Sequence, residues 1–197
     1  YRNEWLSDNF SIVFSAAIIF IAIVVAVIIV IKKKKIVLIK NEKVALMLQT
    51  PIHPGTTFEK IKDKNLGSVW CAVAVIALFY VSAVLQVLCG GYLFSTYDPA
   101  TFNSLWVFVR SAGLIILWVS ANWLVCTLMG GKGKFKEILV VSSYSLIPII
   151  VERFVWILLS QFLLPTEAVF LGILETVTLI YVFIIMCIGM LRIHEFS

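Results

Sequence analysis

Apolar residues along the chain gather in long runs that are separated by short polar or basic stretches. Each run has about twenty residues or more, the length that an α-helix needs to cross ~30 Å of hydrocarbon at ~1.5 Å per residue. No segment shows the alternation over about ten residues that is typical of a membrane β-barrel. The pattern therefore predicts an all-α, polytopic transmembrane bundle of about five spans: 10–31, 69–93, 104–129, 138–164 and 168–191.

Composition supports the membrane class, because hydrophobic residues make up 61% of the chain, charged residues only 14%, and the mean hydropathy is +1.04. A soluble domain needs more polar surface than this. The first run is longer than a signal-peptide core and precedes a lysine block, so we expect an anchor that stays. Because the sequence begins at Tyr1 rather than Met, we expect it to be the processed product of a longer protein. The four cysteines form no CxxC pair and are expected to be packing residues.

The connections between the runs divide the chain into three regions. Residues 1–35 are expected to form an extracytoplasmic stub and a membrane anchor, residues 36–68 a basic cytoplasmic segment, and residues 69–197 a four-span membrane domain. With the N-terminus outside, thirteen of the sixteen lysines and arginines fall on the cytoplasmic side. The positive-inside rule therefore predicts an extracytoplasmic N-terminus and a cytoplasmic C-terminus.

The cytoplasmic segment is expected to contain one short helix. The sequence from Thr56 to Glu59 fits a capping box, with Thr56 as N-cap and Glu59 three positions later. The helix would continue to about residue 64 and carry Phe58 and Ile61 on one side. This pattern is typical of a helix on the inner membrane surface, with its lysines toward anionic headgroups. A solvated, lysine-rich linker is the alternative.

Charged residues inside the predicted spans number four, and their charges sum to zero: Arg110, Glu152, Arg153 and Glu175. A charge within a span costs roughly 2.5–3.5 kcal/mol on insertion scales, so each one needs a partner or a function. Arg110 and Glu175 differ in predicted depth by only ~2 Å. We expect these two residues to form a buried pair, with Glu152 and Arg153 satisfied close by.

Small, hydroxyl and charged residues form one stripe on each of the last three spans, at steps of three and four residues. The stripes are Arg110, Gly113, Leu117, Ser120, Leu124, Thr127; Ser142, Ser145, Ile149, Glu152, Trp156, Ser160; and Gly172, Glu175, Thr178, Val182, Ile185, Gly189. Such faces pack against neighbouring membrane helices, which predicts a common polar seam. The seam is either a path or binding site for an ion, proton or polar solute, or a set of buried pairs that fixes packing. Balanced charge and the lack of histidine within the spans favour the second interpretation.

Two features beside the seam are expected to be structural. Pro148 removes one backbone hydrogen bond from the fourth span, which predicts a helix kink, with nearby serines satisfying the free carbonyl of Tyr144. A basic turn that contains Lys132, Lys134 and Lys136 follows the third span. It lacks the first glycine and the Ser/Thr of a phosphate-binding loop, so we expect a flexible cytoplasmic turn.

Motifs of known enzyme classes are absent from the sequence. It contains no G-x-S-x-G, no H-E-x-x-H and no paired carboxylates in a soluble region. His53 and His194 are isolated, and the cations are spread over membrane-proximal loops rather than gathered in a nucleic-acid-binding patch. We therefore expect no enzymatic activity, no cofactor, no bound metal and no nucleic-acid partner.

Residues 117–148 carry a pattern that resembles the Yip-domain family. In that family a span ends in a glycine turn of the form G-x-G-x-F-K, here residues 131–136, and the next span contains Tyr-x-x-x-Pro, here Tyr144 to Pro148. Other landmarks resemble bacterial members: His53-Pro54, Tyr97-Asp98-Pro99, Leu164-Pro165-Thr166-Glu167 and His194-Glu195-Phe196-Ser197. The resemblance covers about residues 51–197.

The Yip core of the family has five spans, of which four match here, so we expect a four-span Yip-like core to which residues 10–31 add an anchor. Bacterial members are often encoded beside the permeases of carbohydrate ABC importers. We therefore expect a non-catalytic accessory or scaffold protein of the bacterial plasma membrane, in contact with membrane lipids and with other integral membrane proteins such as those permeases. A small channel or secondary carrier that uses the polar seam is the alternative.

Overall fold

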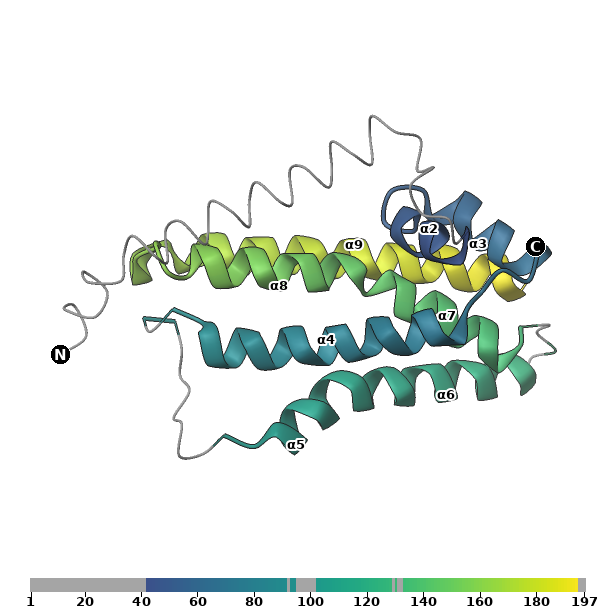
Figure 1. Cartoon of the computed structure of the whole chain (residues 1–197), viewed down its shortest axis with the longest axis horizontal. Coiled ribbons are helices and arrows are strands. Elements are labelled where there is room, and N and C mark those ends of the chain that lie inside the picture. Colours follow the sequence, from purple (N-terminus) through teal and green to yellow (C-terminus); the bar gives the residue numbers. More distant parts are fainter. Residues whose placement is uncertain (1–41, 92, 95–101, 129, 131–132, 195–197) are drawn as a thin grey trace. The chain divides into compact units, whose positions relative to one another are not determined.

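A computed structural model describes residues 42–91, 93–94, 102–128, 130 and 133–194 of the chain, most of which form helices (Figure 1). These residues belong to one compact unit. The predicted anchor at residues 10–31 lies outside the described residues.

Four helical segments among them are long and apolar enough to cross a membrane, so the protein is a multi-pass membrane protein. The four predicted spans from residue 69 onward are thereby confirmed. Their elements are α4 (Val69–Cys89); α5 (Ser104–Phe108), the π-helical turn η2 (Val109–Gly113) and α6 (Leu114–Leu128); α7 (Phe135–Ser145) and α8 (Ile147–Leu159); and the 3-10 turn η3 (Pro165–Glu167) and α9 (Ala168–His194).

Two of the spans begin where a polar side chain caps the helix. The Ser68 side chain accepts a hydrogen bond from the backbone N–H of Cys71 at 3.4 Å, at the start of α4. The Asn103 side chain accepts one from the backbone N–H of Trp106 at 3.2 Å, at the start of α5. Each cap satisfies a backbone donor that has no partner within its helix, which fixes the end of the span.

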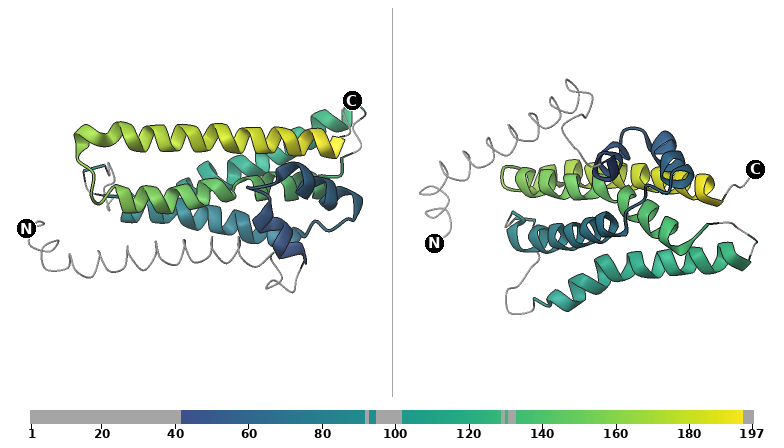
Figure 2. Two further views of the ribbon diagram at one scale, coloured as in Figure 1. Left: turned by 90° about the horizontal axis from the view of Figure 1, so that it is seen from above. Right: turned by 45° about the vertical axis from the view of Figure 1, so that its right-hand side comes forward.

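The spans pack around α7. Helix α4 packs against α7 and α8, and α9 also packs against both. Figure 2 shows α4, α8 and α9 running alongside one another. The third span is divided, because α5 and η2 contact α4 whereas α6 contacts α7. At the start of this span, the Tyr80 hydroxyl hydrogen-bonds the Ser104 hydroxyl, and the Tyr80 and Phe108 rings meet edge to face at 5.5 Å.

The hydrophobic core lies at the end of the bundle where α7 meets α4, α9 and a preceding helix, α3 (Pro54–Asp63). Phe58 of α3 is 0% exposed and Ile61 is also buried. These two side chains do lie on one face, as predicted, but that face packs against α9 instead of the membrane surface. Helix α3 and α2 (Glu42–Gln49), which contacts it, therefore belong to the same compact unit as the spans. The boundary drawn at residue 68 separates segments that pack together.

The predicted capping box at Thr56 is wrong. Helix α3 begins at Pro54, with His53 as N-cap and no side-chain cap. The Thr56 hydroxyl donates to the carbonyl of His53 at 3.3 Å, and Glu59 is exposed. Proline favours the first helical position because its missing N–H would have no helical partner there. Pro54 therefore starts the helix two residues before Thr56, the N-cap that the capping-box pattern predicted.

Lys62 joins α3 to the end of α9. Its Nζ donates to the carbonyl oxygens of Arg192 and Ile193, at 3.3 and 2.9 Å. Carbonyls in the last turn of a helix have no helical partner and carry partial negative charge, so a lysine there is stabilising. This contact and the burial of Phe58 hold the short helix on the longer one.

Candidate functional site

The fourth span is broken into two helices, where the sequence predicted a kink. Helix α7 ends at Ser145 and α8 begins at Ile147, so Pro148 is near the start of a new helix. The backbone N–H of Leu146 donates to the Ser143 carbonyl at 3.0 Å, which closes the turn between them. A proline without an N–H is tolerated in the first turn of a helix, which explains why the break stands at this point.

The serines beside the break do not bond the carbonyl of Tyr144, in contrast to the prediction. The Ser143 hydroxyl donates to the carbonyl of Leu139 at 2.6 Å, and the Ser145 hydroxyl to that of Val141 at 2.8 Å. Each serine thus bonds its own helix one turn earlier, which satisfies the hydroxyl within an apolar environment. Neither serine hydroxyl therefore hydrogen-bonds a backbone group of the break itself.

Arg153 is the best-satisfied charge within the spans. Its Nη1 donates to the Phe79 carbonyl at 2.8 Å and to the Ser82 hydroxyl at 3.2 Å. The guanidinium also lies over the Phe79 ring, with Cζ 4.2 Å from the ring centroid. Arg153 interacts electrostatically with both Glu152 and Glu175. These contacts tie α8 to α4 and bring one cation near both intramembrane carboxylates.

Glu152 lines a different cavity from the other three charges. It is 6% exposed, and its Oε1 has no hydrogen-bond partner among the described residues. The cavity has a volume of 340 Å³ and lies beside the helix break, with Pro148 and Thr178 also in its wall. The side chain is therefore not fully satisfied, in contrast to the prediction.

Arg110 and Glu175 do not form the predicted buried pair. Both residues are exposed, and no ion pair joins them among the residues that the structure describes. They do line the same cavity of 410 Å³, together with Arg153. Arg153, which lines the same cavity, interacts electrostatically with Glu175. Similar depth along two helices brought Arg110 and Glu175 to one cavity, but depth does not fix the direction in which each side chain points.

The π-helical turn η2 explains why the stripe predicted for the third span is displaced. A π turn has one extra residue per turn, so positions after it are rotated relative to a continuous α-helix. Beyond η2, Leu117 is 65% exposed and Leu124 is also exposed, whereas Val119 and Cys126 are buried. The stripe of the fourth span is largely buried, as predicted, and that of α9 is buried only from Val182 onward.

The polar cavity with Arg110 also has lining residues that the sequence did not single out. Asn103 and Trp106 come from the start of the third span, and Gln86 comes from the last turn of α4. A tryptophan two residues into a span is typical of the membrane–water interface. The position of Trp106 was therefore the feature of the sequence that could have indicated this end of the cavity. The cavity therefore extends from the end of the bundle to the intramembrane charges.

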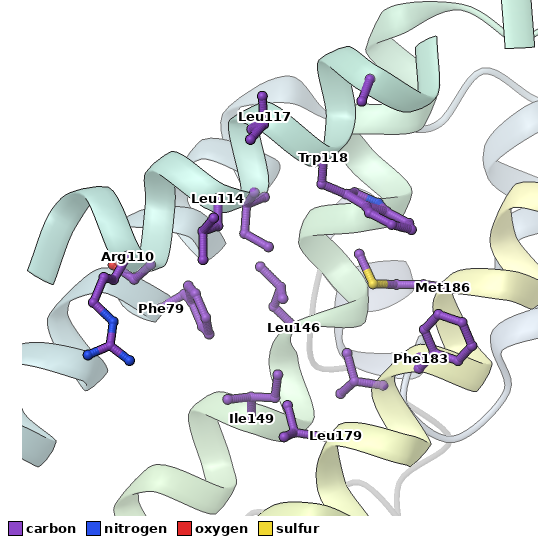
Figure 3. A pocket seen from close by; sticks show the side chains of 14 residues that line it. Phe79, Arg110, Leu114, Leu117, Trp118, Leu146, Ile149, Leu179, Phe183 and Met186 are labelled. Atoms are coloured by element: carbon purple, nitrogen blue, oxygen red, sulfur yellow. The ribbon is translucent and has the colours of Figure 1, made fainter. Parts of the chain in front are cut away.

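A second, larger cavity of 630 Å³ continues from Arg110 and Ser111, which line both cavities. Its other walls are apolar side chains of α4, α6, α8 and α9 and of the break at Leu146. Figure 3 shows Arg110 at one end of this cavity and Trp118, Phe183 and Met186 toward the other. Cavities of 300–1,000 Å³ with a few polar groups in an apolar wall are typical ligand sites.

The basic turn lies at the opposite end of the bundle from these charges, between α6 and α7. Lys132 is outside the described residues. The backbone N–H of Lys134 donates to the Glu137 carboxylate at 3.1 Å, and Lys136 Nζ donates to the Asn65 side chain at 3.5 Å. Lys134 thus stands at the N-terminus of α7, and Lys136 bonds the connection that leads into α4.

The family model of the Yip1 domain matches residues 48–197 of the chain. This range agrees with the resemblance over residues 51–197, and it includes the broken span and both cavities. Neither the curated proteins nor the solved structures contain a significant match to the chain. The match covers all four described spans, and the chain belongs to the Yip1 domain family.

Proposed function

We propose that this protein is a non-catalytic accessory protein that binds other integral membrane proteins laterally. The observation that supports the proposal is a shallow groove of 410 Å³ on α9, lined by Val169, Gly172, Ile173, Thr176 and Val177. Among the described residues, no atom lies within 4 Å of a Cβ added at Gly172. The groove is thus uncovered by these residues, although it lies within a span.

The chemistry of the groove suits another membrane helix. Gly172 and Thr176 are four residues apart, and small residues at this spacing let two helix backbones approach closely in lipid. The Thr176 hydroxyl donates to the Gly172 carbonyl at 2.7 Å, so it presents no unsatisfied donor to a partner. A helix that fits this groove would gain packing contacts without burying an unpaired polar group.

Permeases of a bacterial carbohydrate ABC importer are the first candidates for the partner, on the family resemblance. We place the protein in the bacterial plasma membrane, with the N-terminus outside and the C-terminus in the cytoplasm. The end of the bundle with Lys62, Lys136 and Arg192 would then face the cytoplasm, in agreement with the positive-inside rule. The end that carries Asn103 and Trp106 would face outward.

A small channel or carrier is the second candidate, because the polar cavity brings Gln86, Arg110, Arg153 and Glu175 together within the membrane. A relay for protons or ions normally needs a chain of titratable groups through the membrane. Here the charged residues lie toward one end of the bundle, and Glu152 lines a different cavity. The accessory function therefore accounts for more of the molecule than the carrier does.

Extraction of the protein from its native membrane in a mild detergent tests the accessory function. Gly172→Leu adds bulk in the groove at a position where an added Cβ meets no described atom within 4 Å, and Ala77→Leu adds similar bulk at an exposed position on α4. We expect transporter permeases to copurify with the wild type and the Ala77→Leu variant, and to be lost from the Gly172→Leu variant. A photo-cross-linker at Ile173 should capture the same permease.

Two results would contradict the accessory function. One is an unchanged set of copurifying proteins in the Gly172→Leu variant, or a cross-link from Ile173 to residues 10–31 of the same chain. The other comes from the purified protein in liposomes: saturable solute flux that Glu175→Gln abolishes, in a variant that remains folded, would favour the carrier.

A further inference from the structure

Two cavities share Arg110 and Ser111 in their walls, and we treat them as the polar and the apolar section of one candidate site. The polar section, of 410 Å³, has Arg110, Arg153 and Glu175 in its wall. The apolar section, of 630 Å³, begins at the same Arg110 and Ser111 and continues between α6 and α9. A ligand that fills both sections must itself have a charged end and a long apolar end.

The position of the site along the span matches the arrangement of a lipid. Arg110 is six residues from Ser104, the first residue of the span, which corresponds to ~9 Å along a helix. The apolar section follows the third span from Arg110 to Ala121, a distance of ~16 Å in the direction of the bilayer centre. Trp106, in the polar section, marks the interface side. The charged end of the site therefore lies near the headgroups and the apolar end lies among the acyl chains.

Of the two arginines in the polar section, Arg110 is the one that is available to bind an anion. Arg153 is bound to the Phe79 carbonyl and the Ser82 hydroxyl and interacts with Glu175. Arg110 has no hydrogen bond or ion pair with another described residue. Two guanidinium groups and one carboxylate give the polar section a net positive charge. A guanidinium binds a phosphate through charge-assisted hydrogen bonds, often two in parallel.

Access to the site is from the side of the bundle. Leu114 and Leu117 of α6 and Leu179 and Phe183 of α9 line the apolar section, and all four are exposed (Figure 3). These residues lie in candidate spans, so the surroundings of the opening are lipid. An apolar chain can enter from the bilayer without passing through water.

We propose that this site binds an anionic glycerophospholipid of the surrounding membrane, with the phosphate at Arg110 and one acyl chain in the apolar cavity along α6. Burial of a phosphate beside Arg110 compensates a charge that is otherwise costly in a span. The apolar section takes the acyl chain because its walls offer van der Waals contacts and no competing hydrogen-bonding groups. This binding is separate from the groove at Gly172, because the two cavities of the lipid site share no lining residue with that groove.

Native mass spectrometry of the purified full chain, with lipids of equal acyl chains added, tests the proposal. The lipids are phosphatidylglycerol, phosphatidylethanolamine and diacylglycerol, of which the last has no phosphate. We expect phosphatidylglycerol to bind most tightly and diacylglycerol most weakly. Arg110→Gln should weaken phosphatidylglycerol binding about tenfold, which corresponds to ~1.4 kcal/mol. Arg192→Gln removes an exposed cation at the other end of α9 and should leave binding unchanged.

The apolar section has its own variant. Ala121→Phe narrows the far end of the cavity without changing the charge, and should weaken phosphatidylglycerol binding to a similar extent. Ala77→Phe, at an exposed position on α4 outside the site, is its control. Thermal unfolding of each variant verifies that it is folded, which we expect because Arg110 holds no other described residue in place.

Three results would overturn the proposal. If diacylglycerol bound as tightly as phosphatidylglycerol, the phosphate would not contribute to the affinity. If the Arg110→Gln variant bound phosphatidylglycerol as tightly as the wild type does, the headgroup would not lie at Arg110. Tighter binding of phosphatidylethanolamine than of phosphatidylglycerol would show that Glu175 selects an ammonium group, against the assignment to Arg110.

Discussion

Gly189 is the position at which a single methyl group should damage this protein most clearly. A Cβ added there would overlap Val141 Cγ1 of α7 and would lie 3.0 Å from Cε2 of Phe58 in α3. Carbon atoms in favourable contact are ~3.5–4.0 Å apart, so α9 or its neighbours must move. Val141 and Phe58 are both fully buried, and the χ1 angle of a valine is stiff, so neither side chain can turn away freely. Gly189→Ala should therefore push α9 away from α7 and α3.

The expected loss of stability follows from comparison with a second glycine of the same helix. Gly172→Ala meets no atom within 4 Å. Both variants replace a helical glycine by alanine, so the intrinsic gain in helix propensity, about 0.8–1.0 kcal/mol in water, largely cancels between them. Overpacking of a buried site typically costs about 1–3 kcal/mol. We expect the free energy of unfolding to be lower for Gly189→Ala than for Gly172→Ala by that amount.

Reversible unfolding in mixed micelles of mild detergent and SDS, followed by tryptophan fluorescence, measures this difference. The additional change Val141→Ala removes the methyl group that Gly189→Ala meets. The double variant should be more stable than the sum of the two single losses predicts, with a coupling energy of about 0.5–3 kcal/mol. Equal stability of Gly189→Ala and Gly172→Ala, or strictly additive losses in the double variant, would refute the packing argument.

Three further predictions concern the charges, a tight connection and the topology. Arg153→Leu should lower the free energy of unfolding by about 1.5–3 kcal/mol for each lost hydrogen bond, because it removes the bonds of the guanidinium to the Phe79 carbonyl and the Ser82 hydroxyl. Arg110→Leu should cost less than about 1 kcal/mol in the same SDS titration. Gly91→Ala should cost about 3 kcal/mol, because the added Cβ would overlap the backbone carbonyl at the end of α8. On a cysteine-free background, an impermeant thiol reagent applied to intact cells should label a cysteine at Ser7 but not one at Ser197.

Each of these predictions has a contradicting result. Equal losses for Arg153→Leu and Arg110→Leu would mean that the hydrogen bonds of Arg153 do not hold α8 to α4. Gly55→Ala meets no atom within 4 Å and is the control for Gly91→Ala, so similar stability of the two would contradict the close approach at Gly91. Labelling at Ser197 in intact cells would reverse the proposed orientation.

The neighbours of a helix face could not be read from the sequence. The apolar face of Phe58 and Ile61 was identified correctly, but an apolar face of a short basic helix fits a membrane surface as well as another helix. The structure shows it against α9, where Gly189 lets Phe58 approach. The predicted pair of Arg110 and Glu175 failed for a related reason, since residue spacing gives depth but not the rotation of each helix about its axis.

Local irregularities had a similar effect on the candidate site. Nothing in the sequence from Val109 to Gly113 marks a π turn, yet this turn rotates the rest of the third span and displaces its predicted stripe. Pro148 did mark the irregularity of the fourth span, but a proline permits either a kink or a new helix. Residues of both features line the cavity along α6, namely Ser111 of the π turn and Leu146 of the break, and the cavity was not predicted.

The sequence by itself determined that the chain crosses a membrane, how many spans the described residues contain, and where the helices of three of these spans begin. The reason is local: backbone groups in hydrocarbon must be satisfied within the helix, so the length of an apolar run and the polar cap before it define a span. Val69, Ser104 and Ala168 begin helical elements as predicted. The tertiary structure decided which faces meet, which charge interacts with which, and where a cavity remains. These depend on the rotation and packing of separate helices, which are set by contacts between residues far apart in the chain.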